Sequence, residues 1–200
     1  MRIFLLKILK KPKIVFIESL DRLILKQNEI LLLFGSDEML DKYKYENLSK
    51  NDQLRVDSNP NLDNKNEFKI SRALIFEFEK NYIHLNTQTI YKSISHSANH
   101  AILAISLTRV GVDLECVKNR NFYPCLDFCF SDYEKHQVQN AANPLNEFYK
   151  IWTYKEAMIK LFNLGFYALD KMKENTSSHF SNTLYSGKLK FIYSVAYITF

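Results

Sequence analysis

Gly111-Val-Asp-Leu-Glu115 has the alternating pattern of a β-strand that is buried on one face. Side chains of a strand alternate between its two faces, so Val112 and Leu114 can be buried while Asp113 and Glu115 share the opposite face. The same pattern also fits an ordinary strand end that carries two solvated acids. The stretch therefore predicts a strand and a pair of carboxylates, and the pair needs a further partner before it indicates a function.

A second stretch, Trp152-Thr-Tyr-Lys-Glu-Ala-Met-Ile-Lys160, supplies that partner because it has the pattern of a helix. Glu156 and Lys160 lie one turn apart on the same side of such a helix. Hard carboxylate oxygens suit Mg²⁺, which keeps some of its waters and takes its remaining ligands from substrate phosphates. The lysine can neutralise charge on a departing phosphate. A Glu/Lys pair at this spacing is also common on plain helix surfaces.

Together with other motifs, these two stretches resemble the 4′-phosphopantetheinyl transferase superfamily, in its single-chain, two-lobed, surfactin-synthetase-activating type. The family hallmarks are a G-[VI]-D-[VIL]-E strand followed by a W-[ST]-x-K-E-[AS]-x-x-K helix. Further similar stretches occur in the family order: Leu48-Ser49, Ser71-Arg72-Ala73-Leu74, Ser93-Ile-Ser-His-Ser97, Phe130-Ser-Asp-Tyr-Glu134 and Phe148-Tyr-Lys-Ile-Trp152.

The resemblance implies an α+β fold of two similar lobes related by a pseudo-twofold axis. Each lobe would be a small antiparallel sheet packed with helices, with the active site in the cleft between the lobes. We expect the first lobe over residues 1–108, with the coenzyme A nucleotide contacts. The second lobe is expected over residues 109–200, with the metal site and the catalytic helix.

The activity that the resemblance implies is transfer of the 4′-phosphopantetheine arm of coenzyme A to a serine of an acyl or peptidyl carrier protein, with release of 3′,5′-ADP. By the motif match, Asp113, Glu115 and Glu156 are expected to bind Mg²⁺, with Mn²⁺ as the other possible metal. Glu156 could instead be the base for the serine hydroxyl, or hold the basic water. Lys160 would stabilise the leaving group.

The resemblance is less complete at the positions that would contact coenzyme A than at the positions of the metal site. His96 matches the family histidine that contacts a coenzyme A phosphate, and Ser95 would help to hold the nucleotide. Lys155 matches a family lysine, whose role is either phosphate contact or solvation of the helix surface. Glu67 stands where the family often has an arginine, so Arg72, or else Lys65 and Lys69, could contact the 3′-phosphate in its place.

Composition limits the class of protein without choosing a function. A hydrophobic fraction of 46% indicates a folded protein, and the net charge of +5 fits either a plain basic protein or attraction to an acidic carrier protein. Cys125, Cys129 and His136 could form part of a zinc site, but reduced thiols are the favoured interpretation. No stretch approaches the roughly 18 apolar residues of a membrane span. We expect a cytoplasmic monomer that binds neither membranes nor nucleic acid.

The expected secondary structure follows from hydrophobic periodicity and capping signals. Residues 47–66 are expected to form a surface loop or a mobile segment, followed by a helix capped by Asp63 or Asn64. A capping box is expected at Ser131, and a long helix from Asn143 to Asn163. Strands are expected at the N-terminus, Ile14–Ile17, Glu29–Phe34, Ile90–Ile94, Ala101–Leu107, Val110–Glu115, Lys188–Tyr193 and Val195–Phe200.

Two other functions fit parts of the sequence. One is a degenerate family member that binds coenzyme A or a carrier protein without catalysis, which the weakened basic positions favour. The other is a metal-dependent phosphodiesterase or nuclease, because an Asp-x-Glu pair with a distant Glu and Lys suits two-metal hydrolysis. The Ser-His-Ser segment and the tryptophan helix have no reason to be present in that case.

Overall fold

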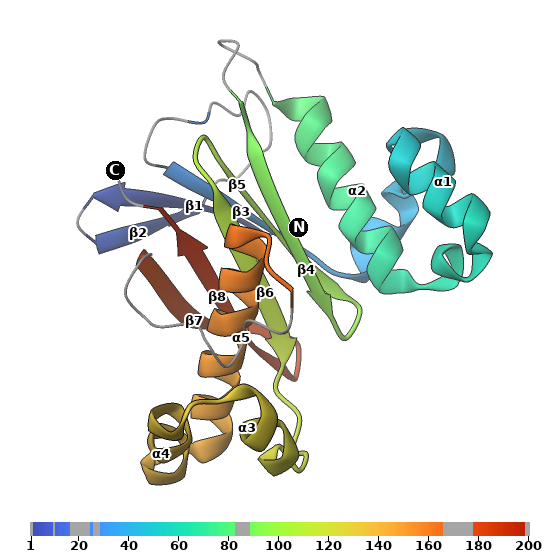
Figure 1. Ribbon diagram of the computed structural model, residues 1–200. Helices are drawn as coiled ribbons and strands as arrows, with labels where there is room; N and C mark the ends of the chain where they lie inside the picture. Colours follow the sequence, from blue (N-terminus) through green and yellow to red (C-terminus); the bar gives the residue numbers. More distant parts are fainter. Residues whose placement is uncertain are drawn as a thin grey trace. The chain divides into compact units, whose positions relative to one another are not determined.

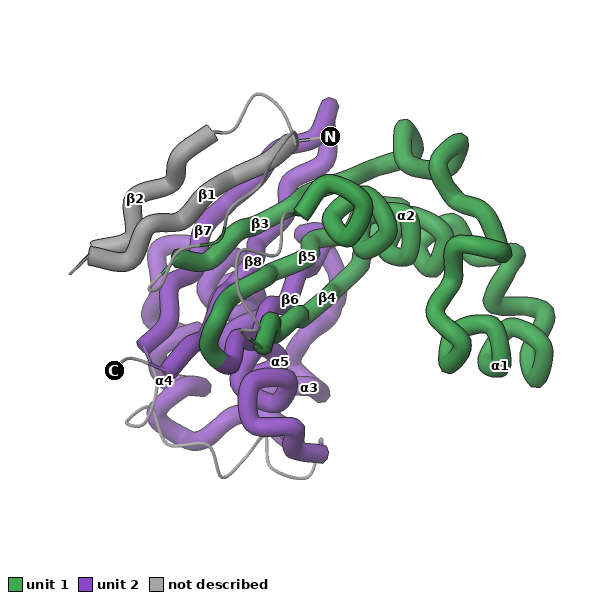
Figure 2. Tube along the Cα trace, turned by 90° about the horizontal axis from the view of Figure 1, so that it is seen from above, with its two compact units in different colours: residues 1–108 green, residues 109–200 purple. Residues whose placement is uncertain are grey.

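The computed structural model describes the backbone of residues 2–9 and 11–16, and all atoms of residues 25, 29–82, 89–165 and 178–198. The chain divides into two compact units, Met1–Thr108 and Arg109–Phe200, coloured separately in Figure 2. Each unit has an antiparallel sheet with a long helix packed on it. The structure therefore confirms the α+β class and the pairing of a small antiparallel sheet with helices in each lobe.

The sheet of the first unit has the strand order β2-β1-β3-β5-β4, and every neighbouring pair is antiparallel. Its strands are β1 (Arg2–Leu9), β2 (Lys11–Phe16), β3 (Glu29–Gly35), β4 (Tyr91–Ser97) and β5 (His100–Ser106). A two-residue turn joins β4 to β5, with φ of 50° at Ala98 and 56° at Asn99. Positive φ at both central residues is typical of a tight hairpin turn. The expected strands are confirmed with shifted ends, and Ile17 lies outside the described residues.

The prediction of a loop over residues 47–66 is wrong, because the segment is mostly helical. It contains η2 (Tyr45–Asn47), α1 (Lys50–Ser58) and η3 (Pro60–Asn64), after η1 (Asp37–Lys42). The Ser49 hydroxyl caps α1 by accepting a hydrogen bond from the backbone N–H of Asp52. Leu48 and Val56 pack against Phe68 of the following helix, so a small apolar cluster holds this polar segment in place.

The following helix, α2 (Asn66–Asn81), starts without a side-chain cap. The expected caps, Asp63 and Asn64, belong to η3 instead, and Asp63 accepts a hydrogen bond from the Tyr43 hydroxyl at 2.5 Å. In Figure 1, α2 lies along β4 and β5. Its apolar face, including Ile70, Leu74 and Phe78, forms the core of this unit with β3 and β5.

The sheet of the second unit has the order β6-β8-β7, again antiparallel. Its elements are β6 (Val110–Cys116), α3 (Tyr123–Cys129), α4 (Asp132–Asn140), α5 (Pro144–Phe162), β7 (Ser178–Ser186) and β8 (Leu189–Tyr197). The two strands expected after residue 187 are a single strand, β8, because Ser194 is buried within the ladder and does not interrupt it. The preceding strand, β7, was missed because its sequence is largely polar.

The long helix α5 begins and ends as expected. The Asn143 side chain accepts a hydrogen bond from the N–H of Asn146, Pro144 occupies the first turn, and Asn163 ends the helix in the left-handed region with φ of 54°. The capping box of Ser131 and Glu134 at the start of α4 is also present. Within the described part of the chain, no helix is both long and apolar enough to cross a bilayer.

Candidate active site

Five predicted site residues lie in the second unit: Asp113 and Glu115 on the first strand of its sheet, and Lys155, Glu156 and Lys160 on α5. A Cβ added to Gly111 would lie 1.9 Å from the carbonyl oxygen of Ala157, so β6 and α5 are in direct backbone contact. Asp113 follows two residues later on the same face of β6 and is only 5% exposed. The carboxylate expected to be solvent-facing is therefore covered, which favours a functional role over a solvated strand end.

Lys160 reaches from the last turn of α5 to the middle of β6. Its Nζ donates hydrogen bonds to Oδ1 of Asp113 at 2.8 Å and to the carbonyl oxygen of Val112 at 3.0 Å. The contact pairs the buried carboxylate with a cation and brings the two sequence motifs together.

Glu156 shares this site and has an altered acidity. Burial, followed by the negative charge of Asp113, raises the pKa of Glu156 to about 7, with a further contribution from Glu115 and opposition from Lys160. A carboxyl group that titrates near neutrality is suited to accept a proton at physiological pH. The negative charges of Asp113 and Glu115 contribute to this rise in pKa, and the positive charge of Lys160 opposes it.

A divalent cation would relieve this repulsion, and three carboxylates are the donor set that Mg²⁺ and Mn²⁺ accept. The residues thus fit a metal in their chemistry. Among the described residues, however, no three histidine, cysteine or acidic side chains are gathered closely enough to hold a metal ion as they stand. The assignment of Asp113, Glu115 and Glu156 as metal ligands stays a prediction.

A chain of three hydroxyl groups, of which Thr153 and Ser194 are buried and Ser181 is exposed, links α5 to the sheet one turn before Glu156. Thr153 Oγ1 lies 2.7 Å from Ser194 Oγ, which lies 2.7 Å from Ser181 Oγ. Thr153 donates its proton to the carbonyl oxygen of Tyr149 at 2.9 Å, so Ser194 donates to Thr153 and Ser181 donates to Ser194.

Register connects this chain to the acidic site. Ser194 is the cross-strand partner of both Asp113 on β6 and Ser181 on β7. A polar row therefore crosses the sheet beneath α5. Sequence reasoning missed Ser181 and Ser194, because each is a lone serine in a strand and nothing local marks it as part of a hydrogen-bonded chain.

Lys155 is turned away from solvent. Its Nζ donates to both carboxylate oxygens of Glu134, at 2.8 and 2.7 Å, and its side chain is 1% exposed. Glu134 also accepts the backbone N–H of Ser131 in the capping box. Solvation of the helix surface, one of the two roles considered for Lys155, is excluded by this burial. The contact favours a role in joining α4 to the helix that carries Glu156.

In the first unit, His96 lies at the end of β4 and is exposed, so its ring can meet a ligand. Its Nδ1 lies 3.7 Å from Oε2 of Glu67, and Oε1 of Glu67 accepts the backbone N–H of Asn99 at 3.4 Å. Ser95, on the neighbouring position of β4, is 7% exposed, so its hydroxyl is largely covered. His100 is buried and stacks on Phe34, whereas His84 lies outside the described residues.

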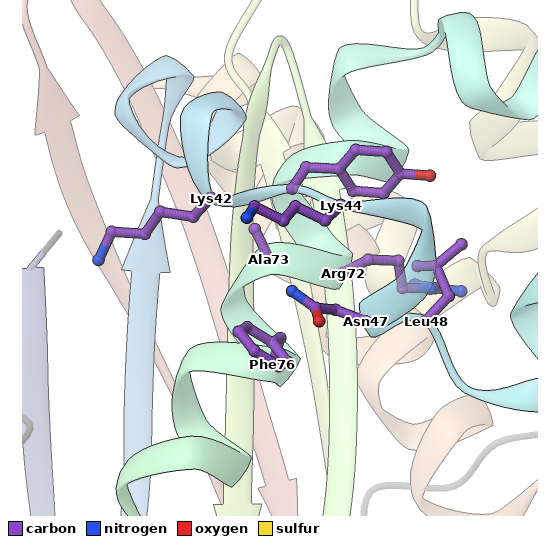
Figure 3. A pocket seen from close by; sticks show the side chains of 8 residues that line it. Lys42, Lys44, Asn47, Leu48, Arg72, Ala73 and Phe76 are labelled. Atoms are coloured by element: carbon purple, nitrogen blue, oxygen red, sulfur yellow. The ribbon is translucent and has the colours of Figure 1, made fainter.

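Arg72 projects from α2 and is partly covered, as its position beside Phe68 predicted. Its guanidinium donates to Asp52 at 2.9 Å and lies 4.7 Å from the centre of the Phe68 ring. Burial alone would raise the pKa of Asp52, but the hydrogen bond and charge of Arg72 outweigh it and lower the pKa. Figure 3 shows Arg72 lining a shallow hollow with Lys44 and other residues. Lys92, on β4, is paired with Glu79.

The helix α5 thus carries an acid and a lysine, and it packs against a strand that carries two further acids, Asp113 and Glu115. Residues 109–196 match the family model of the 4′-phosphopantetheinyl transferase superfamily. The match confirms the resemblance drawn from the motifs and assigns to that superfamily the region that holds the candidate site. No curated protein matches the chain.

Proposed function

We propose that the protein transfers the 4′-phosphopantetheine arm of coenzyme A to a serine hydroxyl of an apo acyl or peptidyl carrier protein. The new bond joins the serine oxygen to phosphorus, the pyrophosphate linkage breaks, and 3′,5′-ADP leaves. The observation that carries the proposal is the meeting of Asp113, Glu156 and Lys160 between β6 and α5, within the region that matches the family. Such a site is suited to charge development on phosphate.

Each residue of the site has a distinct proposed role. Asp113, Glu115 and Glu156 would hold Mg²⁺ or Mn²⁺, which when bound neutralises charge on the pyrophosphate. Glu156, with a pKa of about 7, is suited to accept the serine proton directly or through a water. Lys160 supplies a cation for the departing phosphate. Lys155 is not placed among the ligand contacts, because its ammonium is buried against Glu134.

For the nucleotide of coenzyme A we propose contacts from His96, Ser95 and Arg72. The exposed ring of His96 supports a phosphate contact, and Arg72 lies beside Lys44 on the same unit. The carrier protein would be acidic, attracted by the net charge of +5. We propose that the enzyme works in the cytoplasm as a monomer.

A second candidate, binding without catalysis, is favoured by one specific observation. The cations of the first unit are already partly engaged, because Arg72 is paired with Asp52 and a carboxylate, Glu67, stands beside His96. Both contacts reduce the positive charge available to a nucleotide. The acids and the lysine of the second unit, Asp113, Glu115, Glu156 and Lys160, are all present and favour catalysis. The two functions can be distinguished by whether a carrier protein gains mass.

The deciding experiment is intact-mass spectrometry of a panel of apo carrier proteins incubated with the protein, coenzyme A and Mg²⁺. Catalysis predicts a gain of one phosphopantetheine unit that is lost with EDTA and with Glu156→Gln. Lys150→Gln is the matched control, since Lys150 lies on the same helix in an exposed pair with Glu147. No mass gain on any carrier, with coenzyme A binding retained, would select the non-catalytic binder.

A further inference from the structure

Lys160 is bound to the carboxylate that the proposed function assigns to a metal. The ammonium donates to Oδ1 of Asp113 at 2.8 Å and to the carbonyl oxygen of Val112 at 3.0 Å. The side chain of Asp113 is 7% exposed, whereas that of Lys160 is 29% exposed. The carboxylate is therefore fixed in the interior, and the lysine enters from the open side.

A divalent cation that binds Oδ1 of Asp113 would compete with Lys160 for that oxygen. Two cations cannot both contact one oxygen of a buried carboxylate without strong repulsion, because the interior screens charge poorly. Removal of a lysine from a buried pair is costly unless both charges find new partners. A metal that takes the place of Lys160 therefore supplies a new partner for Asp113 and leaves the ammonium in need of another anion.

The phosphates of coenzyme A supply that anion. The lysine side chain is a flexible four-carbon stem with a mobile donor group, and Lys160 lies in the last helical turn of α5 with part of its length in solvent. A phosphate that binds near this end of α5 can draw the ammonium away from Asp113. The carboxylate is then open to a metal.

We propose that Lys160 holds the place of the divalent cation on Asp113 in the free protein, so that metal and coenzyme A bind with positive coupling through the movement of this lysine. The inference rests on the proposed function, because it takes Asp113 as a metal ligand and coenzyme A as the source of phosphate. It adds that neither ligand binds the free protein with its full affinity, and that each increases the affinity for the other by the same factor.

The test measures Mn²⁺ binding by electron paramagnetic resonance of the free ion, with and without coenzyme A, and needs no turnover. In the wild-type protein, saturating coenzyme A should tighten Mn²⁺ binding about tenfold or more. Lys160→Gln removes the charge and should bind Mn²⁺ alone about tenfold more tightly than wild type, with little further gain from coenzyme A. Lys160→Met, which keeps the apolar stem, should behave in the same way if the glutamine variant folds poorly.

Lys150→Gln is the control for overall charge, because it removes one positive charge from an exposed pair on the same helix. It should leave Mn²⁺ binding within about twofold of wild type. The proposal is overturned if both Lys160 variants bind Mn²⁺ no more tightly than wild type, or if Lys150→Gln tightens binding as much as they do.

The failure of the proposed function would look different. If no variant binds Mn²⁺ under any condition, Asp113 is not a metal ligand. The proposed competition between metal and Lys160 is then also wrong. If Mn²⁺ binds equally to wild type and the Lys160 variants, and carriers still gain mass, the transferase stands and only the coupling through Lys160 is overturned.

Discussion

At the scale of single residues, burial and partners separate two glutamates that the sequence presents alike. Glu134 accepts hydrogen bonds from the Lys155 ammonium and from the backbone N–H and hydroxyl of Ser131, so its role is structural. Glu156, one residue after Lys155, lies among acids, and burial with the charge of Asp113 raises its pKa to about 7. Glu134, with its hydrogen bonds satisfied inside the protein, supports the fold. Glu156, with its raised pKa, is available for proton transfer.

The raised pKa of Glu156 predicts a pH-dependent stability in the absence of metal. Between its usual value of 4.5 and about 7 the folded protein keeps this proton and the unfolded chain releases it. The free energy of unfolding therefore falls as the pH rises through that window, by at most about 3 kcal/mol and less after solvent screening. Urea denaturation in EDTA at pH 5 and pH 7.5 measures the slope.

Glu156→Gln should remove most of that slope, whereas Glu147→Gln on the same helix should keep it, because Glu147 is in a surface pair with Lys150. An unchanged slope in Glu156→Gln would show that another group carries the effect.

Substitution of Asp113 separates chemistry from folding. Asp113→Asn keeps the shape of the side chain but removes the charge that Lys160 contacts, so we expect transfer to fall by at least about a hundredfold. The variant should remain folded by circular dichroism, since an amide oxygen still accepts from the lysine. Asp127→Asn, at an exposed position of α3, should retain full activity. A fully active Asp113→Asn protein would refute the assigned site.

At the scale of elements, the geometry of the site depends on how α5 is held against the sheet. Backbone contact at Gly111 sets the distance between helix and strand, and the hydroxyl chain through Thr153 and Ser194 sets the position along the helix axis. The pair of Lys155 with Glu134 attaches α4 to the same helix. Thr153 and Lys155 precede Glu156 on α5, and Gly111 contacts the turn from Ala157 to Leu161, so an error in these contacts would displace Glu156 and Lys160 together.

The hydroxyl chain predicts that substitutions of Thr153 and Ser194 have coupled effects on the free energy of unfolding. Thr153→Val leaves the Ser194 proton without its acceptor, at a cost of about 1–2 kcal/mol in the free energy of unfolding. Ser194→Ala should cost a similar amount, and the double variant less than the sum, with a coupling of about 1 kcal/mol. Denaturation of the four proteins in a double-mutant cycle measures it, and strictly additive effects would show that the two hydroxyls do not depend on one another.

Close backbone contact predicts that Gly111 tolerates no side chain. In Gly111→Ala the new Cβ would meet the Ala157 carbonyl at 1.9 Å, so α5 must move and both stability and transfer should fall, the former by about 3 kcal/mol or more. Gly187→Ala is the control, since its Cβ meets no atom and only the φ of 57° opposes it. That variant should cost about 1 kcal/mol and keep activity. Equal effects in both variants would contradict the packing argument.

Local signals explain which elements were predicted and which were not. The start of α5 was predicted because Asn143 and Pro144 carry the capping chemistry in the sequence itself. The helix α1 was missed because its stability depends on Val56 meeting Phe68, a contact with a later helix that no local pattern records. The contact of Lys160 with Asp113 was likewise unpredictable, because it joins a helix to a distant strand and depends on their packing.

At the scale of the whole chain, the predicted functions are divided between units that each have their own core. The first unit presents His96 on a strand end and Arg72 on α2, and the second presents the acids and Lys160. The motif order in the sequence anticipated this division of residues. What it could not anticipate is the pairing of Arg72 with Asp52 and of His96 with Glu67, because each partner comes from another part of the chain.

Net charge gives the prediction that concerns the whole protein. With +5 at neutral pH, the protein should attract an acidic carrier over a distance, and salt screens that attraction within about 10 Å at 0.1 M. We expect the KM for the carrier to rise by about tenfold between 50 and 500 mM NaCl. The kcat should change by less than about twofold, because the reacting groups lie in a partly buried site that salt screens weakly.

Steady-state transfer at saturating coenzyme A and Mg²⁺ provides both constants. A parallel series in sucrose controls for viscosity and solvent effects without ionic screening. A KM that stays constant or falls with salt would show that the carrier is recognised through apolar contact and not through charge, since burial of apolar surface strengthens in salt.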